Sequence, residues 1–156
     1  MKIYFAHPAF TDAQMEFKAR FLDSLRLAVE KKYLEKGAPV PEIVDPFQYA
    51  PNIEATEGHK MRFSTAIASV CCRLMQDCFL VIAVADYEDT GVAFELGFAY
   101  ALDIPSLLVS ETKAADKSNA MLRGTSRACI PEVLQADRIS ILVDLIYGFW
   151  ATQAQP

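Results

Sequence analysis

Several features that mark particular classes of protein are missing from this sequence of 156 residues. No stretch approaches the roughly 18 to 20 uninterrupted apolar residues of a membrane span. The first ten residues, MKIYFAHPAF, lack the long apolar core of a signal peptide. The 15 lysines and arginines are scattered and outnumbered by 20 acidic residues, so no basic patch is available for a nucleic acid. We therefore expect a cytoplasmic protein whose partners include neither a membrane nor a nucleic-acid polymer.

A metal-binding pattern is also absent. The four cysteines form no CxxC pair, no histidine cluster accompanies them, and three of them lie in apolar sequence. We interpret them as free thiols that pack as small hydrophobic side chains: Cys71, Cys72, Cys78 and Cys129. The sequence thus predicts neither a metal nor another cofactor.

Short apolar segments alternate with helical patterns along the chain. We predict strands at Lys2–Ala6, Val40–Val44, Cys78–Ala85, Ser106–Ser110 and Arg138–Val143. The third is apolar throughout, which is typical of a central parallel strand covered on both faces. With no repeat or linker, residues 1–156 should form one α/β domain. We expect a doubly wound, flavodoxin-like or Rossmann-like sheet of five parallel strands with helices on both faces.

Helical patterns separate these strands. We expect helices over Asp12–Lys36, Lys60–Gln76 and Gly91–Leu102, and a short one at the C-terminus. Thr11 or Asp12 can cap the first helix, and Gly37 can stop it. We interpret the polar segment from Glu111 to Pro131 as a long loop with one helical turn.

Glu95 is the only charged residue in the apolar helix from Gly91 to Leu102. Ligands of open α/β sheets bind beyond the carboxyl ends of the strands, and this helix follows the central strand at that rim. An unpaired buried carboxylate costs several kcal/mol. Either a lysine or arginine elsewhere pairs with Glu95, or the helix is partly exposed, or the carboxylate is a nucleophile held at the crevice.

Asp89 lies six residues before Glu95, in the loop DYEDTG. Two carboxylates in different environments suit cleavage of a glycosidic bond, because one attacks the anomeric carbon while the other protonates the leaving group. Capping of the following helix explains Asp89 equally well, and Thr90 competes for that position.

Two motifs carry a resemblance to a known family. KIYFAHPAFT at the N-terminus and DYEDTGVAFELGFAYALDIP in mid-chain resemble the nucleoside 2-deoxyribosyltransferases, and the similarity is weaker between about Ala50 and Ser69. The resemblance implies that Glu95 attacks C1′ of a 2′-deoxynucleoside and forms a covalent deoxyribosyl enzyme. It implies that Asp89 protonates the leaving base and that the Tyr4 hydroxyl orients Glu95. Without the resemblance, Tyr4 is equally consistent with an aromatic side chain that only packs in its strand.

The segment SNAMLRG separates relatives within the superfamily. The resemblance implies that Asn119, with Met121 two positions on, reaches the 5′-hydroxyl of a nucleoside bound in a neighbouring subunit of a homo-oligomer. Arg123 and Gly124, however, match related N-hydrolases of deoxynucleoside 5′-monophosphates. Asparagine suits a hydroxyl better than a phosphate, although Asn119 is also a common turn residue.

The resemblance implies further contacts with substrate at the strand ends. They involve Phe10, Asp45, Gln48, Ser69 and Gly91, with Gln48 facing the nucleobase. Ser69 replaces an acid or amide common in the family. His7 also lies at this rim, either as a substrate contact or as a structural histidine. His59 is assigned no role.

The sequence therefore predicts a transferase of nucleotide salvage that exchanges purine or pyrimidine bases on 2′-deoxynucleosides. The alternatives are a 2′-deoxynucleoside 5′-monophosphate N-glycosidase and a nucleotide-binding module without catalysis. The Tyr4, Asp89 and Glu95 set disfavours the last, because a binding module gains nothing from a desolvated nucleophile.

Overall fold

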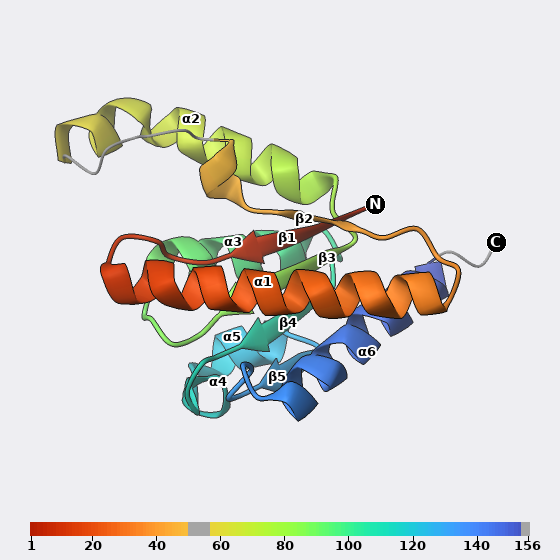
Figure 1. Ribbon diagram of the computed structural model, residues 1–156. Coiled ribbons are helices and arrows are strands. Elements are labelled where there is room, and N and C mark those ends of the chain that lie inside the picture. The colour runs from red at the N-terminus through yellow and green to blue at the C-terminus, as the bar shows by residue number, and fades with distance from the viewer. Residues whose placement is uncertain (50–56, 154–156) are drawn as a thin grey trace.

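Five parallel strands form one sheet at the centre of the protein (Figure 1). The computed structural model describes the backbone of residues 1–49 and 57–153 and the side chains of residues 1–49 and 64–153. The strands are β1 (Lys2–Ala6), β2 (Glu42–Val44), β3 (Leu80–Val84), β4 (Ser106–Val109) and β5 (Ala128–Ile130). Their order in the sheet is β2-β1-β3-β4-β5. This doubly wound order confirms the predicted α/β class and places the topological switch point between β1 and β3.

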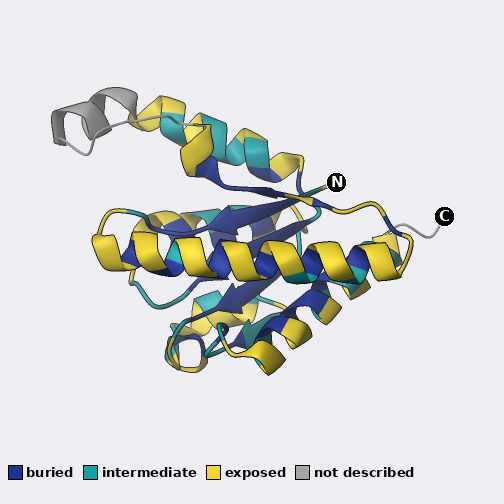
Figure 2. Cartoon of the chain, in the orientation of Figure 1, coloured by how far each residue is buried: buried dark blue, intermediate teal, exposed yellow. Residues whose placement is uncertain are grey.

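Helices cover both faces of this sheet (Figures 1 and 2). They are α1 (Asp12–Glu35), α2 (Glu57–Gln76), α3 (Thr90–Ala101), α4 (Ala114–Lys117), α5 (Ala120–Thr125) and α6 (Ala136–Gln153), with a 3-10 turn, η1 (Pro46–Gln48), after β2. The α1 and α6 helices share one core with Ile3 and Phe5 of β1. A second core, on the other face, joins Tyr4 and Ala6 to α2 and α3. Alternate residues of β1 thus serve opposite faces, as the strand geometry requires.

The first helix begins and ends where its sequence predicts. The Thr11 hydroxyl accepts a hydrogen bond from the backbone of Gln14, whose side chain accepts from the Thr11 backbone. This reciprocal arrangement is a capping box. At the other end Gly37 has a φ of 64°, which glycine adopts without strain, and the chain leaves the helix there. Among the described residues, no helix has the length and apolar character needed to span a membrane.

The predicted position of the fifth strand was wrong. Residues 138–143 belong to α6, and the strand is Ala128–Ile130, within the segment interpreted as a loop. Buried Ile139, Leu142, Val143 and Ile146 follow the helical spacing, and the pattern continues past the end of the proposed strand. The true strand has three residues, too few to show a period. It lies at the sheet edge and gains its hydrogen bonds from β4.

The same segment, from Glu111 to Pro131, contains two short helices as well as the strand. The α4 and α5 helices have four and six residues, which is less than the window over which a helical period is recognisable. The start of α2 at Glu57 precedes the expected Lys60. The side chain of His59 lies outside the described residues.

His7 is buried where β1 ends, and it has an unusual environment. It is 4% exposed, and its ring stacks against those of Phe5 and Phe17 at centroid distances of 5.3 and 5.8 Å. Neither ring nitrogen has a hydrogen-bond partner among the described residues. Burial, with a smaller effect from the Lys18 charge, lowers the pKa of His7 to about 4. His7 is therefore neutral at physiological pH.

We predict that His7 makes the protein sensitive to acid. The unfolded chain binds this proton near pH 6.5, whereas the folded chain binds it only near pH 4, so stability falls as the pH drops through this window. The expected loss is about 3 kcal/mol. A His7→Phe variant keeps a stacked ring and should lose this part of the dependence in urea unfolding between pH 7 and pH 4. If the stability of that variant depends on pH as the wild type does, His7 is not the source of the acid sensitivity.

Candidate active site

The Tyr4 hydroxyl donates a hydrogen bond to Oε1 of Glu95, with a distance of 2.5 Å between the two oxygens. Tyr4 is fully buried on β1, and Glu95 lies half-buried in the second turn of α3. Because β1 is paired with β3, whose end leads to α3, the two side chains meet at the switch point of the sheet. Within residues 1–49 and 64–153, no lysine or arginine forms an ion pair with Glu95. The described structure thus gives this carboxylate a phenol as its partner.

Burial is the main influence on the ionisation of Glu95. It raises the pKa of the carboxyl to about 7, and the negative charge of Asp89 acts in the same direction. The hydrogen bond from Tyr4 opposes this by lowering the pKa of Glu95. Burial and the nearby carboxylate raise the pKa of Tyr4 well above its ordinary value, so that its hydroxyl stays a donor. Near neutral pH Glu95 exists in both its ionised and its protonated form.

Asp89 is the N-cap of α3. Its Oδ1 accepts a hydrogen bond from the backbone of Val92 at 2.9 Å, and the side chain is half-buried. Gly91 lies inside this turn, where a Cβ would be 2.9 Å from the same oxygen. A side chain at position 91 would therefore displace the cap. Thr90, the other candidate, is the first residue of the helix.

The loop after β2 is held by an ion pair that includes Asp45. Its carboxylate, 3% exposed, lies 2.6 Å from the Lys18 ammonium and accepts a hydrogen bond from the backbone of Phe47. The Lys18 ammonium also lies over the Phe47 ring, which forms a T-shaped contact with the ring of Phe10. Asp45 thus supports the rim from within, whereas Phe10, Phe47 and Gln48 are exposed on it.

Asn119 and Met121 lie at the start of α5. Asn119 caps α5 by accepting a hydrogen bond from the backbone of Met121, and both residues are exposed. Met121 is 74% exposed. The α5 helix packs against α3, the helix that carries Glu95. Arg123 donates to the backbone carbonyl of Asp116, an internal contact.

Ser69 lies on α2 and is exposed. Its hydroxyl donates to the backbone carbonyl of Thr65, one turn earlier. Together with Ala68 and Cys72 it lines a shallow hollow on the outer side of the helix. Within the described part of the chain, Ser69 forms no hydrogen bond with Tyr4 or Glu95.

Cys71 is a residue of this site that the sequence interpretation missed. Cys71 is half-buried on α2 and packs against the core that contains Tyr4, and burial together with the nearby Glu95 carboxylate raises the pKa of its thiol. One signal in the sequence pointed inward: Cys71, Leu74 and Met75 recur at helical spacing and form the face of α2 that contacts this core. That spacing cannot show which strand or helix lies opposite.

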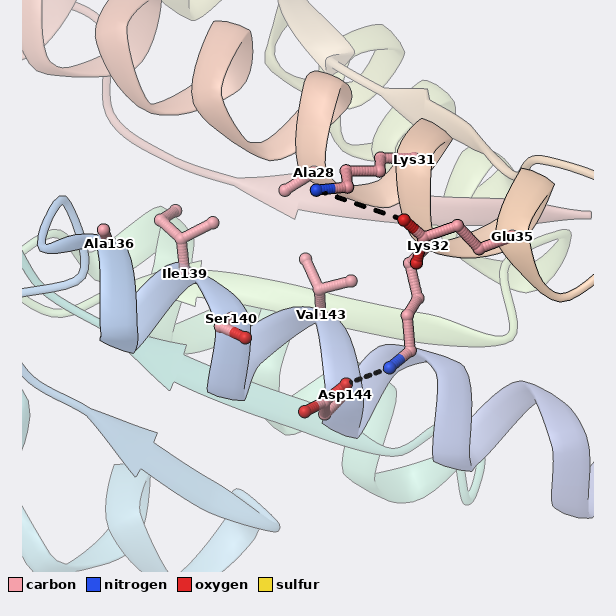
Figure 3. Close-up of a pocket in the computed structure, with 9 residues that line it drawn as sticks. All are labelled: Ala28, Lys31, Lys32, Glu35, Ala136, Ile139, Ser140, Val143 and Asp144. Carbon is pink, nitrogen blue, oxygen red and sulfur yellow. Dashed lines mark hydrogen bonds and ion pairs between the residues drawn. The ribbon is translucent and has the colours of Figure 1, made fainter.

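A separate groove lies between α1 and α6, on the other face of the sheet. It has a volume of about 280 Å³ and is open to solvent. Figure 3 shows the Lys32 ammonium reaching from α1 to Asp144 of α6, a distance of 2.6 Å, while Lys31 pairs with Glu35. No residue predicted for catalysis or substrate binding lines this groove. The candidate active site is therefore the rim around Glu95.

We predict that Glu95 costs the protein stability at alkaline pH. The folded chain holds this proton up to about pH 7 and the unfolded chain only to about pH 4.5, so stability falls as the pH rises through this window. Glu95→Gln keeps an oxygen that can accept from Tyr4 but carries no charge. It should be more stable than the wild type by about 1 to 3 kcal/mol at pH 8. At pH 4.5 the two proteins should unfold at similar urea concentrations, and equal stability at both pH values would refute the account.

Comparison with solved structures shows that the fold is shared. A 2-deoxyribosyltransferase from Bacillus psychrosaccharolyticus is 24% identical over 83% of this chain and 85% of its own, with a TM-score of 0.55. A conserved protein from Enterococcus faecalis is 19% identical over 95% of this chain and 98% of its own, with a TM-score of 0.64. A CMP N-glycosidase from Clostridium botulinum is 17% identical over 94% of this chain and 99% of its own, with a TM-score of 0.55.

Comparison of the sequence identifies the family. No curated protein sequence matches the chain significantly. The sequence model of the nucleoside 2-deoxyribosyltransferases matches residues 3–122, a range that includes Tyr4, Asp89 and Glu95. Members of this family transfer glycosyl groups or cleave glycosidic bonds, and they act on nucleosides and bases. The match covers most of the chain, which therefore belongs to the nucleoside 2-deoxyribosyltransferase family.

Proposed function

We propose that this protein is a nucleoside 2-deoxyribosyltransferase that exchanges bases on 2′-deoxynucleosides through a covalent intermediate on Glu95. The observation that carries the proposal is the hydrogen bond from buried Tyr4 to Glu95 at the switch point of the sheet. The carboxylate is partly desolvated and lacks an ion-pair partner among the described residues, and both conditions favour reactivity toward carbon. The family, established from the sequence, supports the substrate class.

In the first half of the reaction Glu95 attacks C1′ of the deoxynucleoside. A bond forms between its carboxylate oxygen and C1′, the N-glycosidic bond breaks, and Asp89 donates a proton to the departing base. In the second half another base attacks C1′ from the vacated side, Asp89 takes its proton, and Glu95 leaves. Two inversions give net retention of configuration. No cofactor enters these steps.

Tyr4 positions the nucleophile throughout this cycle. Its raised pKa keeps the hydroxyl protonated, so one Glu95 oxygen always has a donor. The hydrogen bond stabilises the free carboxylate more than the neutral ester, which assists departure of Glu95 in the second step. The other oxygen is then available for C1′.

The 5′-hydroxyl of the nucleoside is bound, in this proposal, by Asn119 of a neighbouring subunit. Exposed apolar side chains on α3 and α5, two helices that pack against each other, support self-association, because they offer surface that would be buried between two copies: Phe94, Tyr100 and Met121. Met121 would then lie beside the substrate. Phe10 and Gln48, exposed on the opposite side of the rim, would contact the nucleobase.

Cleavage of a deoxynucleoside 5′-monophosphate by water is the second candidate. It is favoured by Arg123 and Gly124, which match the hydrolase version of the segment before β5. The internal contact between Arg123 and the Asp116 carbonyl counts against a phosphate role for this arginine. The exposed amide of Asn119 also suits a hydroxyl better than a phosphate.

The proposed activity can be tested with deoxyinosine and free adenine, followed by chromatography of the products. We expect deoxyadenosine and hypoxanthine to form, and Glu95→Ala to reduce the rate at least about 1,000-fold because no other group can carry the deoxyribosyl unit. Glu88→Ala, in the same loop, removes an exposed carboxylate and serves as the matched control. It should keep the wild-type rate.

Two outcomes of this assay would contradict the proposal. Release of free deoxyribose 5-phosphate from a deoxynucleoside 5′-monophosphate, with no transfer to adenine, would assign the hydrolase. Absence of turnover with either substrate, in a protein whose unfolding curve is normal, would leave only a binding role.

The shared site predicts complementation between two inactive variants. Glu95→Ala and Asn119→Ala should each be nearly inactive alone, because each lacks one part of every site. After mixing and exchange of subunits, hybrid oligomers contain sites with both wild-type residues, and about a quarter of the wild-type activity should return. Activity that stays at the sum of the two variants, although size-exclusion chromatography shows exchange, would place Asn119 outside the partner's site.

A further inference from the structure

We propose that His7 is a positioning residue of this active site: its ring holds Tyr87, and through Tyr87 it fixes the loop that presents Asp89. The inference rests on the proposed function for the task of Asp89, which is to protonate the departing base. The contacts of His7 themselves are properties of the folded protein. They give a role to a buried histidine that the proposed mechanism does not otherwise use.

His7 belongs to a group of packed rings at the end of β1. Its ring stacks on those of Phe5 and Phe17. Phe21 completes the group, at centroid distances of 5.6 Å from Phe17 and 5.4 Å from Phe5. These three phenylalanines, from β1 and α1, are fully buried. Because closely packed rings leave little free volume, the position of the imidazole is closely determined.

Tyr87 is the point at which the loop after β3 meets these rings. The centroids of the Tyr87 and His7 rings are 6.2 Å apart, and their planes are nearly perpendicular, at 87°. Such a T-shaped arrangement is favourable between aromatic rings. Tyr87 is half-buried and packs against the same core. Neither nitrogen of His7 has a hydrogen-bond partner among the described residues, so His7 holds the loop as a ring.

The backbone carries this contact from Tyr87 to Asp89. The Asp89 N–H donates a hydrogen bond to the Tyr87 carbonyl at 2.7 Å, which closes a tight turn around Glu88. The Asp89 carboxylate in turn accepts from the Val92 N–H as the cap of α3. Asp89 therefore lies between two fixed points, the ring of Tyr87 and the start of α3. Loss of the first would let the carboxylate move relative to Glu95.

The preceding residue, Asp86, anchors the loop on another side. Its carboxylate accepts hydrogen bonds from the backbones of Glu111 and Thr112, in the loop after β4. Tyr87 instead contacts the rings from β1 and α1. Loss of the His7 ring should therefore loosen the loop without detaching it. We expect a smaller effect on the reaction than removal of Asp89 itself would have.

Amide hydrogen exchange tests the contact without any substrate. In His7→Ala the Val92 amide should exchange about tenfold faster, relative to the later turns of α3, because the Asp89 cap that protects it is loosened. His7→Phe keeps a ring and should restore the protection. Leu25→Ala removes a buried side chain of α1 from the same core and controls for lost stability. It should leave this ratio unchanged.

A pair of donor nucleosides tests the link to the reaction. Deoxyinosine needs a proton on its departing base, whereas 7-methyl-2′-deoxyinosine already carries a positive charge on its imidazole ring and leaves without one. In a ping-pong reaction, kcat/KM for the donor reports only the first half-reaction. In His7→Ala this ratio should fall about 10- to 100-fold for deoxyinosine and stay close to the wild-type value for the methylated donor. His7→Phe should recover most of the loss.

Three results would overturn the inference: unchanged exchange of the Val92 amide in His7→Ala, equal losses with the two donors, or no recovery in His7→Phe. Tyr87→Ala removes the other side of the contact and should reproduce the effects of His7→Ala, so it decides the question if that variant does not fold. If no donor reacts with the wild type, the proposed function fails, while the exchange of Val92 still decides whether His7 holds the loop.

Discussion

The hydrogen bond between Tyr4 and Glu95 requires that two segments distant in the sequence meet within 2.5 Å. The requirement is met by the sheet, because β1 pairs in register with β3 and the chain leaves β3 directly toward α3. Strand alternation then matters: Tyr4 faces α3, while Ile3 and Phe5 face α1 and α6. A slip of one residue in β1 would turn Tyr4 to the opposite face and leave Glu95 without its donor.

The same contact explains why an acid can persist in an apolar helix. Burial penalises the ionised form of Glu95, and the hydrogen bond from Tyr4 offsets part of that penalty. The remaining penalty keeps the pKa near 7, within the range where the carboxylate is both present and reactive. The fold thus tolerates a locally unfavourable group at the one place where the proposed chemistry uses it.

The sequence contained more information about the site than about the edge of the sheet. Glu95 stood out because a single charge interrupts a long apolar helix, and the central strand before it placed that helix at the rim. The short β5 strand could not be recognised, because three residues at an edge show no period and depend on β4 for their hydrogen bonds. Cys71 was missed for a different reason. Its helical face was legible, but what that face contacts depends on how α2 packs in three dimensions.

Two basic side chains near the start of α1 hold the loops on both sides of the rim. Lys18 binds Asp45 in the loop after β2, and Arg20 binds Glu111 in the loop after β4.

Asp86 ties the loop after β3 to the same region, because its carboxylate accepts hydrogen bonds from the backbones of Glu111 and Thr112. These acidic residues bind within the protein and so fix the positions of the loops. In the proposed function the exposed Gln48 contacts the nucleobase, so differences in base preference should arise at exposed positions of this kind and not at the residues that hold the loops.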